Sequence, residues 1–100
     1  MEEYNGILLD ENDNVVTTLR EVGAEEPITA PGLSQKLVTK EVVPGGHKAA
    51  RCFIPAGDPV IKYGKKIGRA LKDIEQGEHV HAHNLASCRG KGLRGDKIND

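Results

Sequence analysis

Aromatic residues are scarce in this chain of 100 residues: Tyr4, Phe53 and Tyr63 are its only three, and tryptophan is absent. The core must therefore be built from Val, Ile, Leu and Ala. The chain also lacks the aromatic platform on which single-stranded nucleic acids stack their bases. Lys and Arg number 14 against 15 Asp and Glu, for a formal net charge of −1, which is not the balance of a basic nucleic-acid binder. We therefore do not expect nucleic acid to be a partner.

Cysteine and long apolar runs are scarce as well. Cys52 and Cys88 are too few for a disulfide framework, and we expect them to be thiols in a reducing cytosol. The sequence shows no signal peptide and no apolar run of membrane-spanning length, so we expect a cytoplasmic protein without a membrane partner. One hundred residues make one small domain, which is too small for a deep active-site cleft of its own.

What the chain does have is a series of short β-branched and aliphatic runs separated by turn formers. Residues 7–9 and 15–19 flank the turn-forming run 10–14, so the first 20 residues predict a β-hairpin. We expect a loop over residues 20–32, which contain two prolines and two glycines, and a further strand over residues 37–43.

The second half of the chain contains an internal repeat. Residues 54–60 and 74–80 share the pattern Ile-x-x-Gly-acid-x-Val, which predicts a buried Ile, a turn whose Gly takes a positive φ, and a Val that opens a strand. Short strands with regular glycine punctuation predict a mainly β, compact domain of mostly antiparallel strands. The one helical turn that we expect lies near residues 48–51, where Ala and Lys favour it.

The end of the chain is basic and rich in glycine. From Ala86 onward the periodicity is lost, which predicts a domain over residues 1–85 and a flexible tail over residues 86–100. We expect this tail to be an arm that docks onto an acidic partner.

Three of the four histidines fall within five residues: His79, His81 and His83 alternate with Val80 and Ala82. Alternation at period two predicts a strand with all three imidazoles on one face. Residues two apart on a strand are separated by roughly 6.5 Å and the outer pair by about 13 Å, so at most two can share one metal ion unless the strand bends. A further ligand would come from His47, a carboxylate, substrate oxygens or another chain. The alternative is a solvated polar face.

Five short motifs occur in an order and at a spacing that resemble one known family: Gly46-His47-Lys48, Val60-Ile61-Lys62-Tyr63-Gly64, Ile67-Gly68, Ile74-x-x-Gly77-Glu78 and His81-x-His83-Asn84. This arrangement resembles the SAF domain of the altronate/galactarate dehydratase family of hydro-lyases. It is equally similar to the small subunit of sulfolactate sulfo-lyase. The resemblance runs from about residue 7 to residue 85. It implies a β-clip fold that accompanies a much larger catalytic domain, and dependence on a divalent metal, often iron(II) or manganese.

The resemblance also implies where a site would lie. His81 and His83 align with the family's His-x-His-Asn, and we expect them to be catalytic residues and ligands of a metal shared with the large subunit. His47 and Lys48 align with its Gly-His-Lys, and we expect both to bind substrate, since a lysine supplies a point charge for a carboxylate. His79 falls at a position that the pattern does not fix, and we expect it to be a solvated bystander.

The function that follows is the small subunit of a metal-dependent hydro-lyase, which dehydrates a sugar acid such as altronate or galactarate with a separate large catalytic subunit. Alone, such a chain would bind metal poorly and catalyse nothing. Three alternatives stay open: the small subunit of a sulfolactate sulfo-lyase, a non-catalytic module that binds a sugar acid or an ion, and a nucleic-acid-binding tail with steeply salt-dependent affinity. Homo-oligomerisation is also open.

Overall fold

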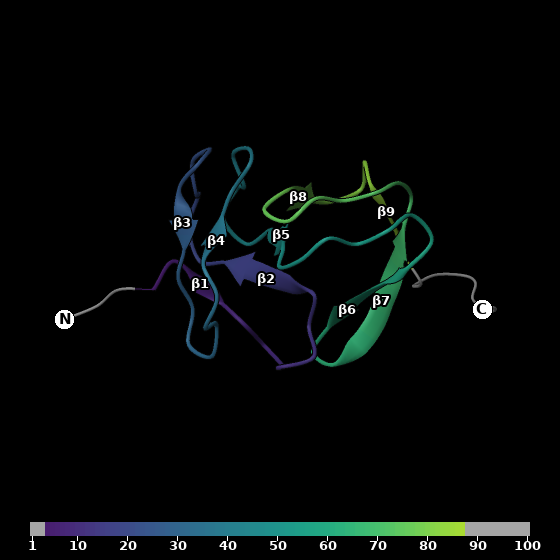
Figure 1. The fold of residues 1–100 in the computed structure, drawn as a ribbon, viewed down its shortest axis with the longest axis horizontal. Helices are drawn as coiled ribbons and strands as arrows, with labels where there is room; N and C mark the ends of the chain where they lie inside the picture. Colours follow the sequence, from purple (N-terminus) through teal and green to yellow (C-terminus); the bar gives the residue numbers. More distant parts are fainter. Residues whose placement is uncertain (1–3, 88–100) are drawn as a thin grey trace.

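A computed structural model describes residues 4–87, and the predicted tail from residue 88 onward lies outside this part of the chain. The described residues form nine strands and no helix (Figure 1). The strands are β1 (Gly6–Ile7), β2 (Val15–Thr18), β3 (Pro27–Ile28), β4 (Leu37–Val38), β5 (Lys48–Ala50), β6 (Pro59–Lys62), β7 (Lys65–Ala70), β8 (His79–Val80) and β9 (Leu85–Ser87). Every strand pair is antiparallel, so the mainly β, antiparallel fold predicted from the sequence is confirmed. Within residues 4–87 there is accordingly no helix that is long and apolar enough to cross a membrane.

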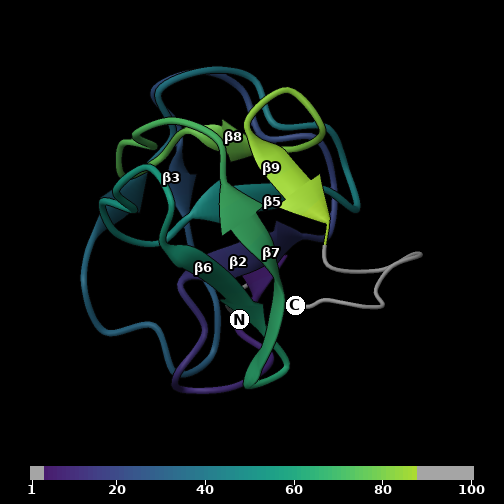
Figure 2. The same cartoon turned by 90° about the vertical axis from the view of Figure 1, so that its right-hand side faces the viewer.

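A central sheet in the order β1-β2-β5-β8 joins the two halves of the domain. The β3–β4 pair lies at one end of this sheet, and the β6-β7-β9 sheet covers the other end, in front of β2 and β5 in Figure 2. The predicted N-terminal hairpin is confirmed, because β1 pairs with β2 across the turn formers. β5 lies between β2 and β8 and pairs with both.

Two hydrophobic clusters form the core, one on each side of β2 and β5. Adjacent residues of a strand point to opposite faces, so Val15 and Ala50 enter one cluster while Val16 and Ala49 enter the other. The first cluster is completed mainly from β6, β7 and β8, and the second mainly from residues 22–43. Small, fully buried alanines on β5 let both clusters approach the sheet closely, which is how a chain with three aromatic residues fills its interior.

The predicted Ile-x-x-Gly-acid-x-Val repeat is confirmed. Ile54 and Ile74 pair with each other in an isolated antiparallel bridge, and Gly57 and Gly77 both have φ of +88°. The same turn occurs twice more in the first half of the chain, where Val22 pairs with Val43 and the positive φ falls on Glu25 and Gly46. These two copies carry different residues at the turn, so the sequence pattern does not reveal them.

Each of the four turns is fixed to a neighbouring strand by the same pair of backbone hydrogen bonds. In each turn, the N–H of the residue with positive φ donates to the backbone carbonyl of one partner residue. The N–H of that same partner donates to the carbonyl of the turn residue that follows the one with positive φ. Three of these partners are strand residues, and the fourth, Thr39, directly follows β4. The partners are Thr39, Thr18, Ala70 and Ala50, for the turns at Glu25, Gly46, Gly57 and Gly77 respectively. Backbone polar groups of the turns are therefore satisfied without regular secondary structure.

Four local expectations are corrected. Residues 48–51 do not form a helical turn: Lys48–Ala50 is strand β5, because fully buried alanines between two strands outweigh a weak helix propensity. The expected loop over residues 20–32 contains β3, and the expected strand over residues 37–43 is shortened to β4 and the bridge at Val43. β8 ends at Val80, so the strand does not run on to residue 83. β9 extends to Ser87, and the predicted division into a domain over residues 1–85 and a tail over residues 86–100 stays a prediction.

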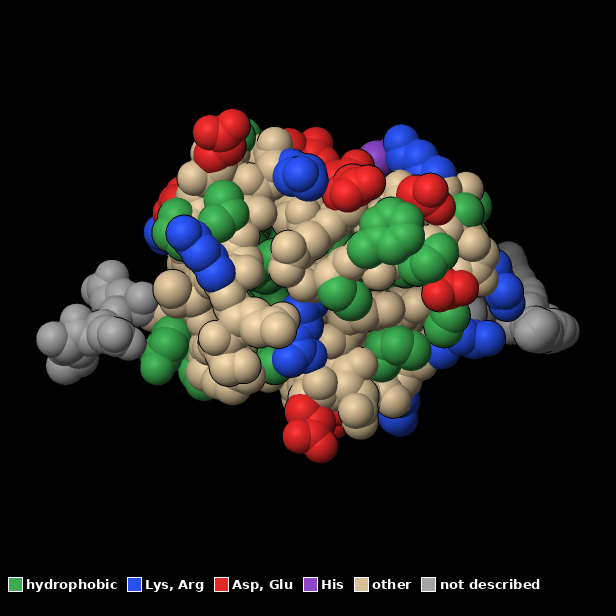
Figure 3. Space-filling view, viewed as in Figure 1, with side chains coloured by type: hydrophobic (Ala, Val, Ile, Leu, Met, Phe, Trp, Pro, Cys, Tyr) green, Lys and Arg blue, Asp and Glu red, His purple; other side chains and the backbone are tan. Residues whose placement is uncertain are grey.

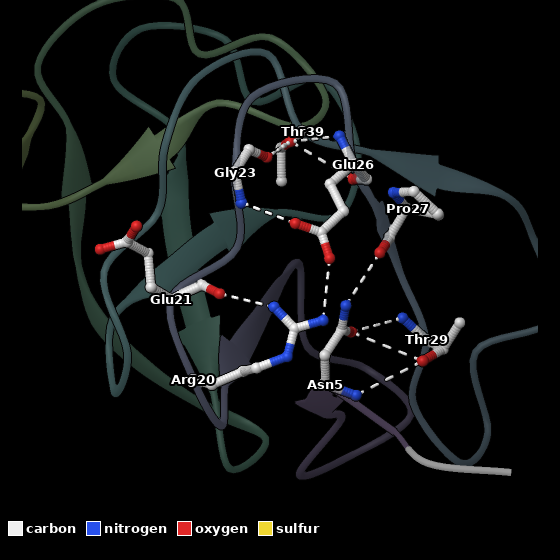
Figure 4. Close-up of polar contacts among 8 residues, drawn as sticks. All are labelled: Asn5, Arg20, Glu21, Gly23, Glu26, Pro27, Thr29 and Thr39. Carbon is white, nitrogen blue, oxygen red and sulfur yellow. Dashed lines mark hydrogen bonds and ion pairs between the residues drawn. The ribbon is translucent and has the colours of Figure 1, made fainter.

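Two networks of polar contacts stabilise turns at the edge of the domain. In Figure 4, the Arg20 guanidinium donates to the Glu26 carboxylate at 2.8 Å, and Glu26 in turn accepts the N–H of Gly23. The second network clamps the β6–β7 hairpin, whose tip residues Tyr63 and Gly64 both have positive φ. The buried Asp13 carboxylate accepts both of their N–H groups, at 3.0 and 2.8 Å.

Candidate functional site

Three of the four histidines meet at the junction of β5 and β8. His47 immediately precedes β5, His79 opens β8, and His81 follows β8. One possible ligand atom of each ring lies within 4.8 Å of those of the other two. His47 Nδ1 and His79 Nε2 are 2.9 Å apart, a hydrogen-bond distance, while the rings of His47 and His81 stack with centroids 4.4 Å apart.

His47 reaches this position because its turn differs from two others in the fold. It is the fourth residue of its turn, and the equivalent residues Glu26 and Glu78 bend their carboxylates back to accept the N–H of the first turn residue. The first residue of the His47 turn is Pro44, which has no N–H to offer. The His47 side chain is therefore free of that structural task and reaches across to β8.

His81 joins the cluster because the chain turns sharply after Val80. The buried Asn84 side chain causes this turn: its Oδ1 accepts the His81 N–H and its Nδ2 donates to the His79 carbonyl, both at 2.9 Å. The Asn84 N–H also donates to the His81 carbonyl. These bonds replace the strand continuation that the alternating sequence predicts, and they bring the rings of His79 and His81 nearly parallel, 12° apart.

The environment favours the neutral imidazole at His79 and at His81. Burial lowers the pKa of His79, and the nearby His47, His81 and His83 rings lower it further, while the Glu41 carboxylate opposes them. Partial desolvation also lowers the pKa of the exposed His81, together with the charges of His47, Lys48 and His83. A neutral imidazole has a free lone pair, which is the form that binds a metal ion.

Lys48, the predicted substrate-binding lysine, lies beside this cluster on β5. Its side chain is half-buried, and burial lowers its pKa, with a smaller contribution from the Lys62 cation. Its charge in turn acts on His81. A cation that is already partly desolvated gains more from an incoming carboxylate than a fully hydrated lysine does.

The structure thus brings together most of the residues that the sequence singled out, except that His79 takes the place of His83 in the close group. His47 and His81 belong to the close group of possible ligands, and so does His79, which was expected to be a bystander. His83 lies outside that group, with its ring 5.5 Å from that of His79. The position of His79 depends on the pairing of Ala49 with His79 across β5 and β8, which no local sequence pattern reveals. The catalytic, metal-binding and substrate-binding roles of these residues stay predictions.

The histidine cluster lies at the protein surface, where His81 is exposed and His47 and His79 are half-buried. Figure 3 shows a histidine at the upper edge of the molecule, beside a basic side chain. Two surface hollows are found elsewhere, one lined by residues that include Lys36, Lys40 and Gln76, and the other by residues of the β3–β4 region and Tyr4. Neither contains a histidine.

Comparisons with known proteins agree with the sequence motifs. The model of the altronate/galactarate dehydratase SAF domain matches residues 4–88. Altronate dehydratase from Bacillus subtilis (strain 168) is 40% identical over 78 residues, which are 78% of this chain and 15% of that protein. The alpha subunit of (2R)-sulfolactate sulfo-lyase from Paracoccus pantotrophus is 42% identical over 62 residues, which are 62% of this chain and 92% of that subunit. Altronate dehydratase from Escherichia coli (strain K12) is 42% identical over 72 residues, which are 72% of this chain and 14% of that protein. The chain therefore spans only a small part of the dehydratases that it matches.

Proposed function

Because this chain belongs to the family of altronate/galactarate dehydratase SAF domains, we propose that it is the small component of a metal-dependent hydro-lyase. It would act with a larger catalytic polypeptide on a sugar acid such as altronate or galactarate. The relatives are lyases, and in the dehydratases the matched region is only 14 to 15% of the protein, which supports a larger catalytic partner. The observation that carries the proposal is the open cluster of histidines beside Lys48, within the matched region.

Dehydration of a hydroxy acid sets three chemical tasks. A base removes the proton α to the carboxylate, an electrophile stabilises the developing enediolate, and an acid protonates the departing hydroxide. A bound divalent metal would supply the electrophile, by polarising the carboxylate and the α-hydroxyl. Imidazole donors suit iron(II) better than manganese, so iron(II) is the metal that we propose. The cluster fits such an ion through its neutral imidazole nitrogens, with His81 as the ligand common to the sequence motif and the structure.

The remaining residues of this chain fit the other tasks. Lys48 holds the substrate carboxylate against the histidine face, where its partial burial strengthens the ion pair. His83 is exposed, and its ring lies 5.5 Å from that of His79. Its role in this proposal is to exchange a proton between the substrate and solvent. The partner covers the open face, excludes water and supplies the remaining groups.

Reconstitution with the large polypeptide tests this proposal. The chain is co-purified with its partner, loaded with iron(II), and assayed for dehydration of altronate and of galactarate. We expect His81→Ala to abolish turnover, and Lys48→Gln to raise KM more than it lowers kcat. Lys65→Gln, an exposed change at the β6–β7 tip, serves as the matched control and should leave both constants unchanged. Wild-type turnover in the His81→Ala and His83→Ala variants would contradict the assigned roles.

A sulfo-lyase is the second candidate, because the Paracoccus subunit matches over 92% of its own length. The same reconstituted complex decides between the two, since sulfolactate cleavage releases sulfite whereas dehydration does not. Tight binding of a sugar acid by the chain, without turnover of any of the three substrates in the complex, would favour a non-catalytic binding module instead.

A further inference from the structure

We propose that His47, His79 and His81 form a divalent transition-metal site within this chain alone, before any partner binds. This goes beyond the proposed lyase function, and it replaces the expectation that the isolated chain binds metal poorly. The ligand set also differs from the pair expected from the sequence, because His47 and His79 take the place of His83. The inference rests on the geometry of the three rings and does not depend on the proposed function.

The spacing of the nitrogens is close to that of a metal site. Two imidazole nitrogens bound to one ion at 2.0–2.1 Å lie about 3.0 to 3.4 Å apart. His47 Nδ1 and His79 Nε2 are already 2.9 Å apart, joined by one shared proton. For a metal ion to take the place of this hydrogen bond, the ring that donates it must carry its proton on its other nitrogen instead, a tautomer change that solvent can mediate. Both rings are then neutral, and each presents a lone pair to the ion. His81 completes the site by a change in side-chain torsion, because its ring is exposed and all three ligand atoms lie within 4.8 Å of one another.

The backbone that carries the three rings is held in place independently of any metal. The His47 N–H donates to Pro44 and its carbonyl accepts from Thr18, which fixes the start of β5. The His79 N–H donates to the Glu41 carboxylate at 3.1 Å. The Asn84 side chain spans His79 and His81, as described above. A site whose ligands are held by such bonds loses little conformational entropy when a metal binds.

The donor set determines which metals fit. Three neutral imidazoles without a carboxylate favour zinc, iron(II), cobalt(II) and nickel(II) over magnesium, calcium and manganese. Three protein ligands also leave at least one coordination position open, as in catalytic zinc sites. The Lys48 cation beside His81 opposes a second positive charge, so we expect a micromolar rather than a nanomolar dissociation constant.

Titration of the full-length chain with Co²⁺ tests the inference. Cys52→Ser and Cys88→Ser are introduced first, so that no thiolate competes. Visible absorption should then show one Co²⁺ per chain, displaced by one equivalent of Zn²⁺. We expect His47→Ala, His79→Ala and His81→Ala each to weaken binding at least about tenfold. His83→Ala is the matched control, since it removes a neighbouring imidazole outside the group, and it should change affinity by less than about threefold.

Urea unfolding of each variant without metal confirms that its fold is retained. A glutamine variant, which is close to histidine in size, replaces any alanine variant that unfolds. The inference is overturned if the chain binds no Co²⁺, if His47→Ala and His79→Ala retain wild-type affinity, or if His83→Ala weakens binding as much as His81→Ala. This experiment measures metal binding by the chain alone, so an inactive reconstituted lyase would not contradict the metal site. Conversely, a chain that binds no metal would overturn the metal site without deciding whether the reconstituted complex is a lyase.

Discussion

Asn84 is the residue on which the shape of the histidine loop, residues 79–84, depends, and Asn84→Ala tests this directly. The side chain is fully buried and makes two bonds to backbone groups of the loop, one to the His81 N–H and one to the His79 carbonyl. Truncation leaves both groups without this partner. Each such loss costs about 1 to 3 kcal/mol, so we expect the free energy of unfolding to fall by about 3 kcal/mol. For a domain of this size that lowers Tm by about 15 °C.

Urea and thermal unfolding measure this cost. Asn12→Ala is the matched control, because Asn12 is exposed and uses only its backbone N–H, so its change should stay within about 0.5 kcal/mol. Asn84→Asp keeps an acceptor for His81 and loses the donor to His79, so it should also destabilise the chain. In both Asn84 variants the affinity for Co²⁺ should fall about 10- to 100-fold. An Asn84→Ala variant as stable as Asn12→Ala would refute the role given to this side chain.

Three further predictions concern the frame around the site. Gly77→Ala should cost about 2 to 3 kcal/mol more than Gly57→Ala in urea unfolding, because both have φ of +88° but only at Gly77 would a Cβ collide with a neighbouring carbonyl; equal costs would contradict this. Asp13→Ala should destabilise the chain by about 2 to 3 kcal/mol, and Asp13→Asn by less, since the amide keeps one acceptor for the β6–β7 tip; the reverse order would be inconsistent with the clamp. The hydrogen bond from Arg20 lowers the pKa of Glu26 below its usual 4.5, so Glu26 contributes stability above about pH 4.5 that is lost as pH falls through the folded value. Glu26→Gln should therefore flatten the acid side of the profile of unfolding free energy against pH, and an unchanged profile would rule out this contribution.

Much of the fold follows from local sequence. The run of acids and asparagines at residues 10–14 predicts a turn, and the strands on either side of it pair as a hairpin. The Ile-x-x-Gly-acid-x-Val repeat predicts two turns with a positive φ at Gly57 and Gly77, and both occur. These features are local because turn conformation is set by the few residues within the turn.

What local sequence cannot give is the pairing of distant segments. Lys48 and two alanines look helical, yet they form a central strand because β5 pairs with β2 and β8. The alanines are buried in the two hydrophobic clusters on opposite faces of the sheet. His47 and His79 are 32 residues apart and meet only through this pairing.

The histidine loop shows a different limit. Alternation predicts a strand through residue 83, but the buried side chain of Asn84 ends it at Val80. Three histidines that a straight strand would separate by up to about 13 Å are drawn together instead. The condition noted from the sequence, that the strand would have to bend, is met by the structure.

The position of the metal in crystals of the Co²⁺-loaded full-length chain tests the histidine cluster most directly. Anomalous scattering at the cobalt edge locates the ion without reference to activity or to a partner. We predict a single peak within about 2.2 Å of one nitrogen each of His47, His79 and His81. A peak held by His81 and His83 without His47, or no peak near β8, would contradict the site.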